Sequence, residues 1–146
     1  MFQLMNVTKE YEFVVKDDPV RPELDYEFRT SSGREMFLLK DVEGELAAVI
    51  CVGYMGDVPT SVNDLNELQS NQNNVAVFYT VWSYKRGAGR QIVFDVVDHI
   101  KKNRESVKRF VTLSPKTEMA RKFHLGNGAI VLSENKETDN YEYLNV

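Results

Sequence analysis

Apolar residues gather in runs that have the length of β-strands. Glu35 to Val42 and Glu45 to Met55 are two such runs, joined by Glu43-Gly44 with the spacing of a hairpin. Val75 to Trp82 is β-branched and aromatic and is apolar on both faces, which is typical of a central strand covered on both sides. These runs predict the middle of a β-sheet.

The helical pattern is clearest after the third run. In Gln91 to Asn103 the apolar residues fall on one stripe at spacings of three and four, as on one face of an α-helix. Lys108 to Ser114 then has strand character again. Strand, helix and strand in this order predict a βαβ unit with two parallel strands and a right-handed crossover.

The first thirty residues have a less regular pattern. Tyr11 to Val15 has strand character and is stopped by Asp17-Asp18-Pro19. Pro22 to Arg29 fits either a short helix or a second strand. We therefore expect strand Tyr11 to Val15 and leave the secondary structure of the next segment open.

The C-terminal third predicts a second helix and a hairpin. Ser114-Pro115 has the pattern of an N-cap followed by proline at the first helical position, and Gly126-Asn127-Gly128 suits a left-handed helix end. Ala129 to Ser133 and Tyr141 to Leu144 then predict a closing hairpin. Together the elements predict an α/β fold, more closely an α+β mixed sheet with helices packed on it.

Length and composition fit a single globular domain over residues 1–146. The chain has 42% hydrophobic and 27% charged residues, which excludes disordered and collagen-like classes, and its one Cys cannot form an internal disulfide. The longest apolar stretch, Leu46 to Met55, is about half of the roughly 20 residues of a membrane helix. The N-terminus has no secretory signal pattern, so we expect a cytoplasmic protein without a membrane contact.

Charge is distributed unevenly along the chain. The net charge is −4, but the first 80 residues carry 14 acidic and 6 basic side chains, whereas the rest carry 8 acidic and 12 basic ones. An acidic total disfavours nucleic acid as a partner, because that binding relies on a basic face. The basic half fits a smaller polyanion and the acidic half fits a cationic partner.

The segment with the most specific chemistry is Val81 to Val93, in which a strand enters a glycine turn that opens a helix. Such a turn points unpaired N–H groups and the positive helix end at one place, and Gly87 and Gly89 let a ligand approach the backbone. Cationic side chains follow closely: Lys85, Arg86 and Arg90. The segment predicts a phosphate site, with an ordinary strand-to-helix turn carrying surface charge as the alternative.

Two common phosphate motifs are excluded by their missing residues. No Lys-Ser or Lys-Thr pair follows the glycines, which excludes the P-loop of nucleoside triphosphatases. A dinucleotide fingerprint requires a third glycine where Ile92 stands.

Residues 84–93 resemble motif A of the GNAT superfamily of acetyl-CoA-dependent N-acetyltransferases, usually written Arg/Gln-x-x-Gly-x-Gly/Ala. Gly87 and Gly89 match its small positions, and Tyr84 stands at its first one. Thr117 to Ala129 is similar to motif B and keeps Ala120, Phe123 and Gly128. The phrase from Thr112 to Ala120 is also similar to proteins of tailed bacteriophages, which implies a compact, phage-encoded form.

The resemblance implies a mixed sheet of about six or seven strands, flanked by helices, in which the parallel central strands splay apart. The pantetheine arm of acetyl-CoA, the implied co-substrate, then pairs with the exposed backbone of one strand, and its diphosphate lies on the glycine turn. The implied cofactor-binding residues are Val81, Trp82, Lys85, Arg86, Gly87, Ala88, Gly89 and Arg90. No metal is implied.

The implied chemistry is direct attack of a neutral amine on the thioester. The family commonly places a general-acid tyrosine where this chain has His124, so His124 is the candidate acid, with a purely packing role as the alternative. The base is left open between Asp57, Glu67, Tyr79 and water.

The acceptor implied is a small-molecule amine or a protein lysine, and the chain is expected to be a monomer or a homodimer. A GNAT-fold module that binds acyl-CoA without turnover and acts through a protein partner is an alternative. A further alternative is an unrelated α/β domain whose glycine turn binds a nucleotide phosphate.

Overall fold

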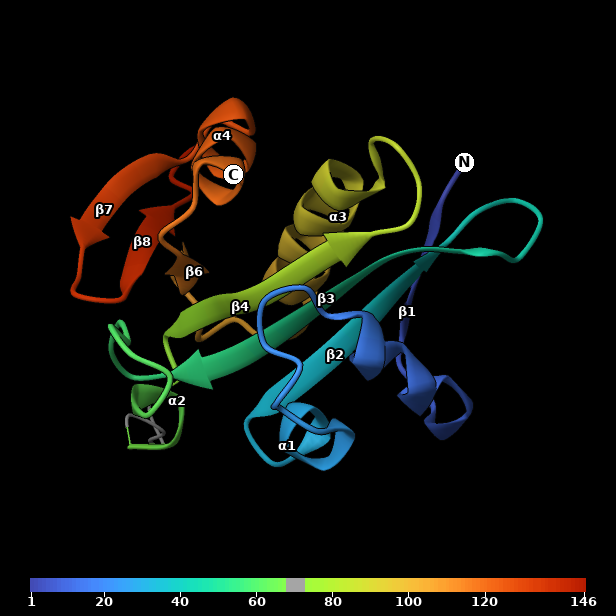
Figure 1. Ribbon diagram of the computed structural model, residues 1–146, viewed down its shortest axis with the longest axis horizontal. Coiled ribbons are helices and arrows are strands. Elements are labelled where there is room, and N and C mark those ends of the chain that lie inside the picture. Colours follow the sequence, from blue (N-terminus) through green and yellow to red (C-terminus); the bar gives the residue numbers. More distant parts are fainter. Residues whose placement is uncertain (68–72) are drawn as a thin grey trace.

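The computed structural model describes residues 1–67 and 73–146, which form a mixed sheet with helices on both faces (Figure 1). The strand order is β1-β2-β3-β4-β5-β8-β6, with β7 paired to β8, so the described residues build eight strands where the resemblance implies six or seven. The bounds are β1 (Gln3–Asn6), β2 (Arg34–Lys40), β3 (Leu46–Met55), β4 (Val75–Ser83), β5 (Arg109–Thr112), β6 (Ser114–Pro115), β7 (Ile130–Glu134) and β8 (Thr138–Glu142).

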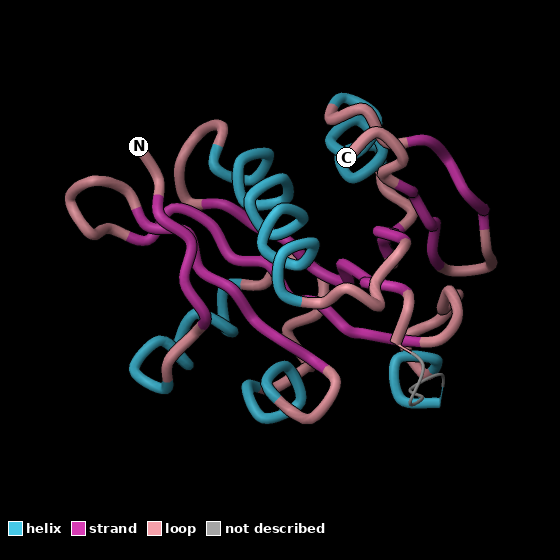
Figure 2. Tube along the Cα trace, turned by 180° about the vertical axis from the view of Figure 1, so that it is seen from behind, coloured by secondary structure: helices cyan, strands magenta, loops and turns pink. Residues whose placement is uncertain are grey.

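The helices divide between the two faces of the sheet. They are the 3-10 helix η1 (Lys9–Asp17) and the α-helices α1 (Tyr26–Thr30), α2 (Asp64–Glu67), α3 (Ala88–Asn103) and α4 (Glu118–Gly126). Helix α3 crosses one face, while η1 and α1 lie on the other, as the views from the front and from behind show (Figures 1 and 2). Strand β2 shows the reason, since Phe37 and Leu39 pack in the core cluster of α3 and Met36 and Leu38 pack in that of η1.

The structure confirms the predicted centre of the sheet. Strands β2 and β3 form an antiparallel hairpin, in which Phe37 pairs with Ile50. Strands β4 and β5 are parallel, with Ala76 opposite Phe110, and α3 connects them. The closing hairpin is also present, although β8 begins at Thr138, three residues before the predicted start. The mixed α+β sheet is therefore as expected.

The expected strand at Tyr11 to Val15 is wrong, because this segment is the 3-10 helix η1. The free edge of β2 is already occupied by β1, in which Leu4 pairs with Leu39. The consecutive residues Val14 and Val15 are both buried on the face of the sheet, which an alternating strand does not allow. The open segment from Pro22 contains the short helix α1.

The expected N-cap at Ser114-Pro115 is also wrong. These two residues form β6, whose Ser114 pairs with Asp139 and whose Pro115 pairs with Thr138. Helix α4 begins at Glu118, and the side chain of Thr117 caps it by accepting a hydrogen bond from the N–H of Ala120. A proline at a short strand is tolerated because it lies where no ladder donor is needed.

Candidate active site

The two parallel strands separate halfway along β4. Their ladder runs from Val75 opposite Arg109 to Phe78 opposite Thr112, and the last backbone bond is donated by the N–H of Leu113 to the carbonyl of Phe78 at 3.0 Å. Beyond this point β4 continues to Ser83 beside β3 alone. The chain after Thr112 turns away instead and joins β8 through β6.

Side chains of β5 and β8 hold the second strand in this diverging path. Asn140 is fully buried, and its Nδ2 donates to the carbonyl of Thr112 at 2.7 Å and to that of Pro59 at 2.9 Å. The hydroxyl of Thr112 accepts from the N–H of Tyr141 at 3.0 Å. Because these polar groups of Thr112 are satisfied by β8 and the loop before β4, the strand pair can end here without burying unpaired groups.

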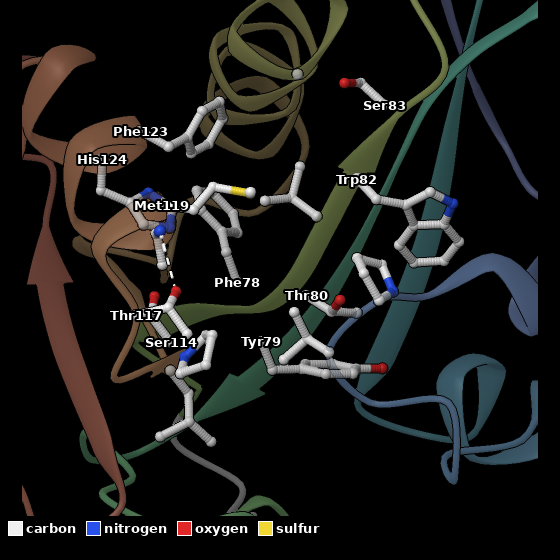
Figure 3. Close-up of a pocket in the computed structure, with 17 residues that line it drawn as sticks. Phe78, Tyr79, Thr80, Trp82, Ser83, Ser114, Thr117, Met119, Phe123 and His124 are labelled. Carbon is white, nitrogen blue, oxygen red and sulfur yellow. Dashed lines mark hydrogen bonds between the residues drawn. The ribbon is translucent and has the colours of Figure 1, made fainter.

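A cavity of about 320 Å³ lies in the gap between the strands. Its long wall is β4 from Phe78 to Ser83, and the opposite wall is built by residues 113–115 and by α4 (Figure 3). Pro19 and Val20 close one end, and Gly89 of α3 lies at the other. None of the described residues that line the cavity is an Asp, Glu, Lys or Arg, so the gap suits an uncharged, extended group.

The glycine turn meets this cavity at the start of α3. Gly87 has φ = 79°, the left-handed region that favours glycine, and it turns the chain out of β4 into the helix. The N–H groups of Arg86, Gly87, Gly89 and Arg90 have no partner within residues 1–67 and 73–146. Free donors at a helix start are a feature that anions can bind, and the phosphate site at this turn stays a prediction.

The three cationic side chains near the turn differ in their surroundings. The Nζ of Lys85 contacts Asp41 at 2.6 Å and Glu45 at 2.8 Å, which raises the pKa of Lys85 and neutralises its charge. Arg90 donates to the carbonyl of Gly126 at 3.2 Å and so joins α3 to the end of α4. Arg86 is exposed, and in the described part of the chain its side chain has no partner. Arg86 is thus the most available cation of the three.

Gly89 leaves little free space beside the cavity. A Cβ at this position would lie 3.3 Å from Cε1 of Phe123 and 3.7 Å from Cβ of Ser83. Ala88 is fully buried in the core next to it. The sequence expectation that position 89 must be small therefore has a steric reason, namely the approach of α4 to the start of α3.

The structure brings His124 into the cavity wall but leaves it uncharged. His124 lies in this wall (Figure 3), is only 4% exposed, and its ring stacks on Tyr141 at 5.2 Å. Burial lowers the pKa of His124 to about 4, so the ring is neutral at pH 7. A neutral ring donates one hydrogen bond but carries no imidazolium proton to release. Its role as general acid stays a prediction.

The neighbours of His124 select one of its tautomers. The hydroxyl of Tyr143 lies 2.7 Å from Nδ1 of His124, and Nδ2 of Asn127 donates to the same hydroxyl at 3.3 Å. The phenol oxygen accepts from Asn127, and its own proton finds no other acceptor among the described residues, so that proton points to Nδ1 of the histidine. The ring proton then sits on Nε2, which leaves an N–H donor for a group in the cavity.

Val81 and Trp82 form part of the β4 wall, and the Trp82 side chain is fixed on the face of η1. Its Nε1 donates to the hydroxyl of Tyr84 at 3.0 Å, and that hydroxyl donates to Asp17 at 2.7 Å. Two elements far apart in sequence are thereby connected beside the cavity.

The three side chains considered as bases are not brought together in the cavity. Asp57 and Glu67 are exposed and do not line it. Tyr79 contributes to the wall, but its ring packs in the core cluster of η1 and burial raises its pKa well above the ordinary value. A phenol of this kind does not ionise at neutral pH, and the assignment of the base among the four candidates stays a prediction.

Sequence analysis missed the contribution of the N-terminal segment. We call residues 17–30 the strap, because they cross the end of the gap and supply Pro19 and Val20 to the cavity. Below them, the carboxylate of Asp18 contacts Nη1 of Arg29 at 2.8 Å in a fully buried ion pair. The sequence did contain a signal for this burial, namely the run Asp17-Asp18-Pro19 followed by two arginines, because a buried charge requires a partner of opposite charge.

Neither a membrane-spanning helix nor a metal-binding group is found among the described residues. No helix among them is both long and apolar enough to cross a membrane. In the same part of the chain, no group of three or more His, Cys, Asp or Glu side chains is arranged to hold a metal ion.

Known proteins were compared with the chain by sequence and by structure. No family model matches it, and no curated protein matches it. By structure it is similar to an acetyltransferase of Bacillus subtilis in complex with CoA, with a TM-score of 0.66, 11% identity and 98% coverage of both chains. It is equally similar to the N-acetyltransferase PseH of Campylobacter jejuni, with a TM-score of 0.64, 11% identity and 99% coverage of both chains.

A third similar structure is malonyl-CoA decarboxylase from Agrobacterium vitis, with a TM-score of 0.67 and 22% identity. There the match covers 84% of this chain but only 35% of the other, so the chain spans about a third of that enzyme. With the acetyltransferases the match extends from end to end. The chain therefore has the GNAT fold, and the resemblance found in motifs A and B is confirmed at the level of the fold. The resemblance to bacteriophage proteins stays a prediction.

Proposed function

We propose that the protein transfers an acetyl group from acetyl-CoA to a primary amine. The observation that carries this proposal is the gap between β4 and β5 beyond Phe78, which opens at the free N–H groups of the α3 start. An extended thioester with a diphosphate at one end fits these two features together. Two structural neighbours with end-to-end coverage are acetyltransferases, and one of them holds CoA.

Each part of acetyl-CoA has a suitable region of the chain. The diphosphate accepts hydrogen bonds from the N–H groups between Arg86 and Arg90, with the Arg86 side chain adding charge. The pantetheine arm pairs with the backbone of β4 at Val81 and Trp82, which faces the uncharged cavity. The thioester then lies in the part of the gap between His124 and the strap.

The transfer requires no covalent intermediate with the protein. The neutral nitrogen of the acceptor attacks the thioester carbon and a tetrahedral oxyanion forms. When the C–S bond breaks, the nitrogen loses its second proton and the thiolate takes up one proton, so that CoA leaves as the thiol. In this proposal Nε2–H of His124, a residue of the cavity wall, donates a hydrogen bond to the leaving sulfur. The proton of the acceptor ammonium passes to water, because no carboxylate is found among the described residues of the cavity wall.

The acceptor is a small-molecule amine or a protein lysine. We add one alternative, in which the same cleft binds acyl-CoA without turnover and the protein acts through a protein partner. The low pKa of His124, about 4, favours this alternative because it removes the charged acid from the site.

The test measures binding first and turnover second. Isothermal titration of the purified protein with CoA is expected to show binding, and ATP is expected not to compete with it. Acetyl-CoA consumption is then followed with a thiol reagent against a panel of amines and lysine peptides. Absence of CoA binding refutes the proposal, displacement by ATP supports a nucleotide site, and binding without turnover supports the alternative module.

A further inference from the structure

Arg21 of the strap lies across the point at which the two strands part. Its Nε donates to the carbonyl of Tyr79 in β4 at 3.0 Å, and its Nη2 donates to the carbonyl of Leu113 at 3.0 Å. The side chain is 7% exposed, and one guanidinium therefore connects both strands inside the fold.

This contact stands directly after the last backbone bond of the ladder. The N–H of Leu113 donates to Phe78, and the next pair of groups along the two strands is joined by Arg21 instead of by each other. Tyr79 is also the extra residue of a bulge, since Cys51 pairs with Thr80 while Val52 pairs with Phe78. Directly after the end of the β4–β5 ladder, the carbonyl of Tyr79 thus accepts its hydrogen bond from the side chain of Arg21.

The strap fixes the backbone of Arg21 in this place. The carboxylate of Asp18 accepts hydrogen bonds from the backbone N–H of Arg21 at 3.0 Å and from Thr80 at 2.9 Å. Arg29 donates to the carbonyl of Arg21 at 2.6 Å and to Asp18 at 2.8 Å. The cluster thus holds the backbone of Arg21, while the two strand carbonyls hold its guanidinium.

A guanidinium between two carbonyls acts as a spacer. Adjacent strands in a ladder lie about 4.8 Å apart, and a planar group that donates to both carbonyls keeps them further apart than a direct backbone bond does. It also occupies the Tyr79 carbonyl, so that an arm entering the gap must pair with β4 beyond that residue.

We propose that Arg21 is a positioning residue which holds β4 and β5 apart and thereby sets the width and register of the slot for the pantetheine arm. The inference rests on the proposed function. A residue of the strap, outside motifs A and B, then controls the affinity for the pantetheine arm. The affinity of the α3 start for the diphosphate does not depend on it.

The experiment separates the arm from the diphosphate end. Titration of Arg21→Gln is expected to give a CoA dissociation constant raised about tenfold, while that of adenosine 3′,5′-bisphosphate, which has no arm, stays unchanged. Arg21→Lys keeps the charge but cannot donate to both carbonyls in one plane, so its CoA affinity is expected to fall about threefold or more. Arg21→Lys also serves as the test variant if Arg21→Gln does not fold.

Arg34 provides a matched control. It is also a buried arginine on the face of η1, but its hydrogen bonds among the described residues go to Ser31, Asn66 and the carbonyl of Leu65, the last at 2.8 Å, and not to β4 or Leu113. Arg34→Gln is expected to lower the melting temperature while leaving CoA affinity unchanged.

Three results overturn the inference. One is a folded Arg21 variant with parental CoA affinity, and another is an equal loss of CoA affinity in Arg34→Gln. The third is a parallel loss of affinity for the armless nucleotide. If the unmodified protein binds no CoA at all, the proposed function itself fails, which is a different outcome from an Arg21 variant that binds as well as its parent.

Discussion

At the scale of single residues, His124 shows how a motif position can be kept in place while its chemistry changes. The ring lines the cavity, but the aromatic rings around it, Phe123, Tyr141 and Tyr143, exclude water and keep it neutral. The resemblance to the family could single out His124, because it stands where the family commonly has a tyrosine. It could not give the protonation state, which depends on neighbours that the sequence does not show to be close.

The neutral state of His124 predicts a pH-dependent stability. The pKa of His124 in the fold is about 4, against an ordinary value of 6.5, so the unfolded chain binds this proton more readily. Its contribution is complete above pH 6.5 and is lost as the pH falls from 6.5 to 4. Urea unfolding is expected to show about 2 kcal/mol less stability at pH 5 than at pH 7 from this group.

His124→Gln should reduce this slope, because Gln does not titrate. The comparison uses the difference between parent and variant at each pH, since acidic side chains titrate equally in both. Identical slopes in parent and variant would show that the ring is not held neutral by burial.

At the scale of elements, the prediction from sequence succeeded where the apolar residues follow one clear pattern along a segment. The stripe of α3 and the two-sided apolar run of β4 each gave the right element, because their burial follows local patterns that the sequence shows. The strap and β6 were missed. Val14 and Val15 have the residue types of a strand, but β1 already occupies the edge of the sheet. Ser114-Pro115 has the pattern of a helix cap, but it pairs with β8 instead.

The close packing at the start of α3 predicts the effect of a larger side chain at position 89. Gly89→Val adds atoms where a Cβ alone comes within 3.3 Å of Phe123, next to the cavity and the free N–H groups. CoA affinity is expected to fall about tenfold or more, measured by titration calorimetry. Gly126→Val is the matched control, because this glycine also lies in a helix and a Cβ there would meet nothing within 4 Å. Equal CoA affinities in the two variants would contradict the assignment of the α3 start to the ligand.

At the scale of the whole molecule, the strap is attached to the sheet by charge. Asp18 and Arg29 are both fully buried, and Asp18 also holds Thr80 of the central strand. Burying two charges is costly, but removing one partner costs more, because the other charge then stays buried alone. The pair therefore makes the N-terminal thirty residues depend on the central strands.

Asp18→Asn is expected to destabilise the protein by about 3–5 kcal/mol, because Arg29 loses its ionic partner inside the fold. Urea denaturation measures the loss. Glu45→Gln is the control, since Glu45 pairs with Lys85 on the surface and its side chain is 61% exposed. The Glu45→Gln substitution should change the midpoint of urea unfolding little. A midpoint for Asp18→Asn as close to the parent as that of Glu45→Gln would show that the strap is held by apolar contacts alone.

The divergence of β4 from β5 also bears on how such a protein changes over evolutionary time. A slot bordered by main-chain groups makes few demands on the amino acids along it, so substitutions can accumulate on both strands while strand pairing and its abrupt end persist. At 11% identity, the likeness to the two acetyltransferase structures is accordingly one of fold and not of shared amino acids.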